Sequence, residues 1–156
     1  MKIKALIISI KSIKLSKKEK TLLLKEKPWG IILFKRNLKS FKQIKKLISS
    51  IKKVTNNPKF PIIIDEEGIN VSRLREIINH EFSANFFGKY YRQDKISCIK
   101  IYKYYINSLC RILKELGINI NTIPVLDVLR SNTNKIIGNR SFSNNNKIVR
   151  ELGQLT

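Results

Sequence analysis

Residues 60–74 read FPIIIDEEGINVSRL, and this stretch decides how the rest of the chain is interpreted. The isoleucines at 62–64 are β-branched and follow Pro61, a pattern that predicts a short buried strand. The acidic residues at 65–67 follow at once, so the strand delivers carboxylates to one edge of a sheet. Such an edge is where α/β proteins commonly place their chemistry.

The apolar residues of the chain alternate between strand-like and helix-like spacing. Ser16 and Glu19 form a capping-box pattern at the start of one helix, and Gly117 is a suitable C-terminal cap for another. The stretch 70–93 is less regular, and no element is predicted there. Alternating strands and helices indicate parallel strands joined by right-handed crossovers. Strands are predicted at 3–10, 30–34, 61–64 and 118–128, and helices at 16–25, 40–54, 95–116 and 144–155.

Two α/β architectures are compatible with this alternation. The chain has 156 residues, 42% of them hydrophobic, which is enough for one domain with a core. An open doubly wound sheet can be complete near this length, whereas a (β/α)₈ barrel usually needs about 250 residues. Length alone therefore favours the open sheet, but the motifs described below favour the barrel.

The net charge of +21 suggests a nucleic-acid or anionic-membrane partner. The excess of lysine, isoleucine and asparagine is also what an AT-rich genome encodes by default. The lysines spread over every predicted helix, and no RNA- or DNA-binding motif is present. Compositional bias is therefore the favoured explanation, while a non-catalytic basic protein that binds nucleic acid or anionic surfaces is kept as an alternative.

The cysteines and the N-terminal segment bear on the compartment. Cys98 and Cys110 have neither the spacing nor the nearby histidine of a metal site, and free thiols suggest a reducing environment. The apolar run at 5–10 is interrupted by Lys11 and is too short for a signal peptide or a membrane span. We therefore expect a cytoplasmic protein with no metal site.

Polar side chains follow three of the predicted strands. A carboxylate can accept two hydroxyl hydrogen bonds and an arginine can donate two, so this edge suits a sugar. Acids at strand ends also cap helices and pair with lysines, so a purely structural role is an equal alternative. These side chains are those of 35–37, 65–67, Arg73, Asp127 and Arg140.

Four motifs occur in a fixed order: GIILFKRN at 30–37, IIIDEEGINVSRL at 62–74, GININTIPVLDV at 117–128 and IIGNRSFS at 136–143. Together they resemble the N-terminal barrel domain of glycoside hydrolase family 3, and most closely the bacterial cytoplasmic β-N-acetylhexosaminidases of peptidoglycan recycling. The resemblance runs from about Gly30 to the last residue. It implies an α/β fold that is the N-terminal half of a (β/α)₈ TIM barrel.

The resemblance assigns sugar binding to three residues. Asp65 matches the aspartate that binds hydroxyls of the terminal N-acetylglucosamine, Arg73 matches the arginine that helps to hold it, and Arg140 matches an arginine lining the sugar site. Glu67 is expected to be structural. The family motif D-x-E-G-G-x-V-x-R has a second glycine where this chain has Ile69. Because a β-branched residue resists positive φ, the sequence alone does not determine the conformation of this loop.

The catalytic residues of the family have no counterpart in these 156 residues. The K-H-F-P-G-H-G segment, whose histidine is the general acid/base, does not occur, and neither does the downstream aspartate that is the nucleophile. His80 lies in no motif and is interpreted as a surface or packing residue. Asp127 is interpreted as a structural or site-wall residue. No catalytic residue is therefore predicted.

The resulting hypothesis is that residues 1–156 are a partial family 3 N-terminal domain, truncated before the catalytic loop. The complete enzyme would release terminal N-acetylglucosamine from anhydromuropeptides by a retaining mechanism, without a cofactor. The chain alone is expected to be inactive, and its expected partner is the missing C-terminal half of the barrel. Because half a barrel leaves a sheet edge open, the chain is also expected to be marginally stable or oligomeric. A decayed gene copy is a third alternative.

Overall fold

The computed structural model describes residues 2–156, whose contacts divide them into two compact units. The first unit runs to Asp65 and also includes 73–78 and 112–121. The second unit consists of 66–72, 79–111 and 122–156. No helix within residues 2–156 is both long enough and apolar enough to cross a membrane.

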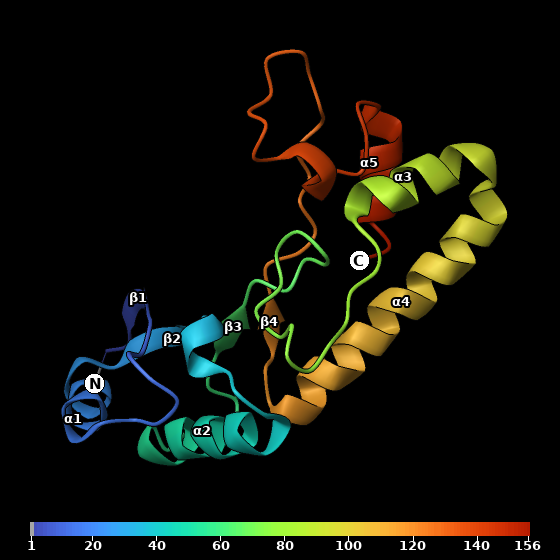
Figure 1. The fold of residues 1–156 in the computed structure, drawn as a ribbon. Coiled ribbons are helices and arrows are strands. Elements are labelled where there is room, and N and C mark those ends of the chain that lie inside the picture. The colour runs from blue at the N-terminus through green and yellow to red at the C-terminus, as the bar shows by residue number, and fades with distance from the viewer. Residues whose placement is uncertain (1) are drawn as a thin grey trace. The chain divides into compact units, whose positions relative to one another are not determined.

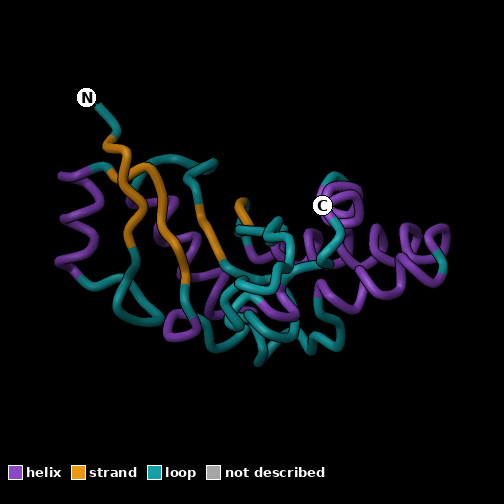
Figure 2. The backbone as a smooth tube through the Cα atoms, turned by 90° about the horizontal axis from the view of Figure 1, so that it is seen from above, coloured by secondary structure: helices purple, strands orange, loops and turns teal. Residues whose placement is uncertain are grey.

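The first unit holds a four-stranded sheet with the order β1-β2-β3-β4, and every pair is parallel (Figure 1). Each strand therefore pairs with its neighbour in the chain, which is the order of a barrel; a doubly wound sheet reverses its order at one point. Figure 2 shows the first three strands lying side by side. The predicted α/β class is confirmed. The strands are β1 (Lys4–Ile8), β2 (Pro28–Leu33), β3 (Ile62–Ile64) and β4 (Ile120–Asn121).

Strand β3 is the buried strand predicted from the opening motif. Its three isoleucines are all buried, and β2 pairs with it from Ile31↔Ile62 to Leu33↔Ile64. Residues on a strand that is covered on both faces are apolar at every position rather than at alternate positions. Burial on both faces therefore explains the continuous apolar run at 62–64.

Two helices of the first unit confirm their predicted starts. In α1 (Lys17–Glu26), the Ser16 hydroxyl accepts a hydrogen bond from the Glu19 amide, and the Glu19 carboxylate accepts one from the Ser16 amide. In α2 (Phe41–Val54), Ser40 caps the first turn. Both caps satisfy backbone donors that have no partner inside the helix. The buried stripe of α2 is Ile44, Leu47, Ile48 and Ile51.

The fourth strand is shorter than the predicted range 118–128, because only Ile120 and Asn121 join the sheet. Pro124 has no N–H group to donate to a ladder, so regular pairing ends before it. The side chain of Asn119 takes over part of the pairing: its Oδ1 accepts a hydrogen bond of 2.7 Å from the Ile62 amide, and its Nδ2 donates to the Phe60 carbonyl.

The second unit contains a helix that the sequence did not predict, α3 (Ala84–Gln93), inside the irregular stretch 70–93. Ser83 caps it by accepting a hydrogen bond from the Phe86 amide. Gly88 in its middle weakens the helical pattern, because glycine is a poor helix former. The packing of α3 against another segment therefore outweighs this low propensity.

The remaining helices of the chain agree with the prediction. Helix α4 (Lys95–Leu116) has the predicted bounds and carries both free cysteines, and α5 (Asn146–Gly153) begins at the cap residue Asn145. Short 3₁₀ turns, η1 (Lys35–Asn37) and η2 (Gly138–Arg140), follow β2 and precede α5. The buried core of the second unit consists of Phe87, Cys98, Tyr102, Ile106, Phe142, Ile148, Val149 and Leu152.

Candidate functional site

Asp65 and Arg73 form an ion pair in the first unit, where β3 ends. Arg73 Nη2 donates a hydrogen bond of 3.0 Å to Asp65 Oδ2. Their side chains keep 22% and 30% of their surface exposed, so both groups can still reach a ligand. The structure thus brings together two of the three residues to which the sequence assigned sugar binding.

The ring of Phe34, directly after β2, lies beside this pair. The Arg73 guanidinium carbon is 5.8 Å from the ring centroid, and that of Arg36 is 4.7 Å from it. Arg36 is held by hydrogen bonds to the Ile10 carbonyl and to the Ser9 hydroxyl. Such cation–π contacts limit the rotation of a guanidinium group without consuming its N–H donors.

Asn37, one of the polar residues predicted at this edge, has a structural position. Its side chain is fully buried, and its Nδ2 donates to the carbonyls of Ile10 and Ser12, while its Oδ1 accepts from the Phe34 amide. The two bonds from Nδ2 tie the segment after β1 to the segment after β2, and the bond to Phe34 holds the turn after β2. Asn37 therefore fixes the loops at the sheet edge.

The loop in the second unit that follows Asp65 is built around Gly68. Its φ is +135°, a value that L side chains rarely adopt, and the amides of Glu67 and Gly68 both donate to the Val71 carbonyl. Within residues 2–156, Lys27 and Asn56 are the non-glycine residues with positive φ. Ile69 is not among them, so the positive φ of this loop falls on Gly68 and not on the β-branched residue.

Glu67 and Arg140 form a two-bond ion pair in the second unit. Arg140 Nε and Nη2 donate to Glu67 Oε2 and Oε1, both at 2.8 Å. A planar fork bound at two points to a carboxylate has a fixed orientation. The sequence suggested a structural role for Glu67. In the structure, Glu67 orients Arg140, the third sugar-binding candidate.

Glu66, His80 and Tyr105 form a buried chain of hydrogen bonds that sequence reasoning missed. His80 Nε2 lies 2.6 Å from Glu66 Oε1, and His80 Nδ1 lies 2.8 Å from the Tyr105 hydroxyl. His80 and Glu66 are both buried, so His80 is a packing residue and the surface alternative is wrong. Burial, and then the charge of Glu66, raise the pKa of Tyr105 to about 12.

A small cavity adjoins the Glu67–Arg140 pair in the second unit. Its volume is about 30 Å³, and aromatic rings form much of its wall. A space of this size holds about one water molecule, whereas pockets for organic ligands usually measure hundreds of Å³. A sugar that contacts Arg140 must therefore do so from outside this cavity. The aromatic residues that line it are Phe82, Phe87, Tyr102, Tyr105 and Phe142.

The described part of the chain, residues 2–156, shows no group of three or more histidine, cysteine, aspartate or glutamate side chains that could hold a metal ion. Asp127, which the sequence left as a structural or site-wall residue, is exposed, and its backbone carbonyl accepts a hydrogen bond from the Ser141 hydroxyl. The sugar-binding candidates of the sequence therefore lie in two Arg–carboxylate pairs, Asp65–Arg73 and Glu67–Arg140.

Comparison with protein families and with curated relatives gives a consistent result. Residues 1–156 match the family model described as glycosyl hydrolase family 3 N-terminal domain. The β-hexosaminidase of Xanthomonas axonopodis pv. citri is 30% identical over 144 residues, which are 92% of this chain and 42% of that protein. The β-hexosaminidase of Neisseria meningitidis is 33% identical and is covered over 39% of its length. The chain thus spans less than half the length of these relatives.

Solved structures with the same fold include NagZ from Neisseria gonorrhoeae in complex with N-trifluoroacetyl-D-glucosamine. It is 30% identical, with a TM-score of 0.90 over 98% of this chain and 46% of that chain. A family 3 β-N-acetylglucosaminidase from Paenibacillus is 25% identical, with a TM-score of 0.81 over 97% of this chain and 28% of that chain. The four parallel strands and their helices therefore match the N-terminal part of these proteins.

Proposed function

Because the chain belongs to glycoside hydrolase family 3, we propose that it is the N-terminal part of a β-N-acetylhexosaminidase and contributes to the binding of a terminal N-acetylglucosamine. Asp65, Arg73 and Arg140 are the proposed sugar-binding residues. The observation that carries the proposal is the partly exposed Asp65–Arg73 pair at the end of β3. It offers carboxylate acceptors beside guanidinium donors, which is the pairing that sugar hydroxyls require.

The proposed substrate is an N-acetylglucosamine-containing muropeptide, and the proposed setting is peptidoglycan recycling in the cytoplasm. The relatives named β-hexosaminidase and the neighbour bound to N-trifluoroacetyl-D-glucosamine support the sugar class. In this proposal residues 1–156 form a partial domain that supplies sugar contacts but neither the acid/base nor the nucleophile, since these 156 residues contain no K-H-F-P-G-H-G segment.

Titration of the ¹⁵N-labelled 156-residue chain with N-acetylglucosamine, followed by NMR, tests the sugar-binding role. We expect saturable shifts at the amides of Asp65 and Arg73. Asp65→Asn should weaken binding about tenfold, because it replaces a charge-assisted acceptor by a neutral amide and breaks the ion pair that orients Arg73.

Asp94→Asn is the matched control, because Asp94 is an exposed aspartate outside the proposed site whose Oδ1 accepts a hydrogen bond from the Ser97 amide. It should bind the sugar like the unmodified chain. Shifts that never saturate, or an equal loss in Asp65→Asn and Asp94→Asn, would sink the sugar-binding role.

The proposal that residues 1–156 lack the catalytic groups is tested separately with a chromogenic N-acetyl-β-D-glucosaminide. The 156-residue chain should leave it intact, and reading the coding DNA beyond the codon of Thr156 shows whether an acid/base segment follows in frame. Turnover by the 156-residue chain would contradict the proposal that these residues lack the catalytic groups.

A further inference from the structure

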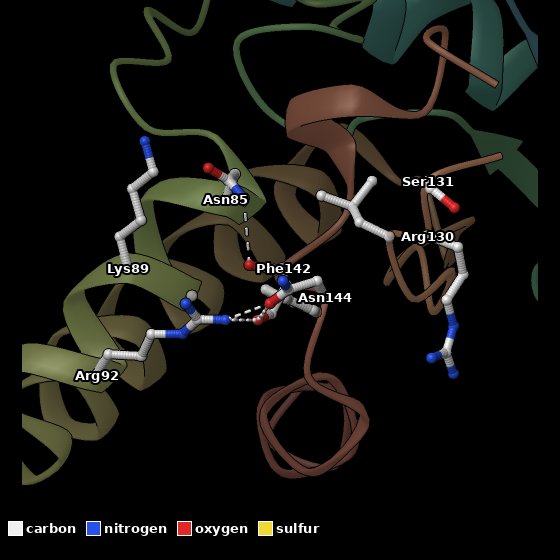
Figure 3. Close-up of a pocket in the computed structure, with 10 residues that line it drawn as sticks. Asn85, Lys89, Arg92, Arg130, Ser131, Phe142 and Asn144 are labelled. Carbon is white, nitrogen blue, oxygen red and sulfur yellow. Dashed lines mark hydrogen bonds between the residues drawn. The ribbon is translucent and has the colours of Figure 1, made fainter. Parts of the chain in front are cut away.

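The second unit has an open cavity of about 410 Å³ between α3 and two loop segments (Figure 3). Asn85, Lys89 and Arg92 line it from α3, while residues 129–131 and 142–144 line it from the other side. Its volume is in the range of ligand pockets. None of the three proposed sugar-binding residues lines this cavity.

The lining of this cavity is rich in cations and free of acids. It includes Lys89, Arg92 and Arg130 but no aspartate or glutamate. Within residues 2–156, none of these three cations belongs to an ion pair. Three positive charges in a lining that contains no acidic residue repel one another, and a bound anion would relieve that repulsion.

One of the three cations is already held in place. Arg92 Nη2 donates to the Ser143 hydroxyl at 2.8 Å and to Asn144 Oδ1, as the dashed lines of Figure 3 show. Serine and asparagine orient a guanidinium group without neutralising its charge. The positive charge of Arg92 thus remains available to a ligand, and less entropy is lost when the ligand binds.

The wall that carries Arg92 is tightly packed at Gly88. A Cβ atom on Gly88 would lie 1.7 Å from the Phe142 carbonyl oxygen, so α3 and the segment 142–144 meet backbone to backbone. Asn85 Nδ2 also donates to that carbonyl. The cavity is therefore framed by two segments that are packed directly on each other.

A second open cavity, of about 480 Å³, continues the same surface and shares Arg92, Arg130 and Asn144 with the first. Its other lining residues, Asn145 and Asn146, stand at the start of α5, where the helix dipole adds positive potential. No acidic residue lines this cavity either. Two adjoining cavities thus present donors and positive charge over one continuous surface.

We propose that the surface around Lys89, Arg92 and Arg130 is a binding site for a small ligand that carries an oxyanion, either a phosphate or a carboxylate. Lys89 and Arg130 supply charges on exposed side chains from opposite sides, and Arg92 supplies one that is held by hydrogen bonds. Ser131 adds a hydroxyl donor at the rim. This site extends beyond the proposed sugar-binding role and does not depend on it.

The lining favours a small oxyanion over a nucleic acid. Single-stranded nucleic acids bind through aromatic side chains on which the bases stack. The aromatic residue lining the first cavity is Phe142, which is 2% exposed and belongs to the core, and the second cavity has none. Phosphate or carboxylate recognition needs only the donors that these cavities offer.

Titration of the ¹⁵N-labelled 156-residue chain with inorganic phosphate, at a constant and near-physiological ionic strength, tests the proposal. We expect saturable NMR shifts at the Arg92 side chain and at the amides of Ser131 and Asn144. Arg130→Gln and Lys89→Gln should each weaken phosphate binding about tenfold. Both side chains are exposed, so these variants should fold normally.

Arg111→Gln is the matched control: it removes one arginine charge from an exposed position on α4, outside both cavities. Parallel titrations with acetate distinguish carboxylate from phosphate as the recognised group. Equal weakening by Arg111→Gln and Arg130→Gln would show diffuse attraction to a highly basic chain and overturn the site. Binding of a short single-stranded RNA with no response to phosphate or acetate would also overturn it, in favour of a nucleic-acid surface.

Discussion

The hydrogen bonds around His80 show how one buried imidazole connects the motif of residues 62–74 to a long helix. His80 contacts Glu66, which lies in the sequence between Asp65 and Glu67, and it also contacts Tyr105 of α4. Buried polar groups are costly unless they are paired, so this chain of bonds specifies one arrangement of the loop. His80 therefore helps to hold the loop that follows Asp65 in place through its hydrogen bond with Glu66.

The buried tyrosines predict a loss of stability at high pH. Burial raises the pKa of Tyr102 and Tyr105 to about 12, from 10.0. In the unfolded chain these phenols lose their protons at the lower pH, so the stabilisation is fully present below pH 10 and is lost as the pH rises toward 12. Urea unfolding at a series of pH values, followed by circular dichroism, should show this decline.

Tyr105→Phe is the comparison for this prediction, because it removes one of the two ionisable groups. Its overall stability should be lower, since the bond to His80 is lost, but its stability should fall less steeply above pH 10. Parallel pH curves for the two proteins would show that Tyr105 does not cause the decline.

The position of helix α3 depends on a close backbone approach at one residue, Gly88. Gly88 lets the helix approach the Phe142 carbonyl at a distance that no side chain permits. The backbone on the other side cannot rotate away as the end of a flexible side chain can. The close packing of α3 against the segment 142–144 therefore requires that residue 88 has no side chain.

Gly88→Ala should lower the free energy of unfolding by about 3 kcal/mol or more, at or above the upper end of the range for overpacked cores. Urea denaturation gives this value. Gly153→Ala in α5 is the control, because its added methyl would meet the end of the Leu126 side chain, which can move. Equal, small effects of the two substitutions would mean that the Gly88 contact is not tight.

The elements also show what the sequence could and could not predict. The continuous apolar run at 62–64 and the cap at Ser16 have local signals, so β3 and the start of α1 were predictable. Helix α3 was missed because its stability comes from contact with residues more than 50 positions away. The bidentate bond between Glu67 and Arg140 was hidden for the same reason, since sequence motifs identify candidate residues but not their partners.

At the scale of the whole chain, the first strand is the most exposed part of the sheet. β1 is an edge strand that pairs only with β2 among the described residues, and Leu6 and Ile7 are 50% and 53% exposed. Successive residues of a strand point to opposite faces, so apolar surface is available on both sides of β1. Exposed apolar edge strands promote association between chains.

The 156-residue chain should therefore self-associate as its concentration rises, and Ile7→Lys should reduce this association. Sedimentation velocity over a range of protein concentrations measures it. Ile96→Lys is the control, because Ile96 is even more exposed, at 70%, but lies on α4 rather than on a sheet edge. A monomer at all concentrations, or equal effects of the two variants, would contradict a role for β1.

The division into two units also separates the chain's intrinsic fluorophores. The single tryptophan, Trp29, lies in β2 of the first unit, whereas all five tyrosines lie between residues 90 and 105 of the second. Tryptophan emission therefore reports on the first unit, and near-ultraviolet tyrosine signals report on the second unit, without any added label. A single unfolding experiment read in both channels shows directly whether the two units melt together or in sequence.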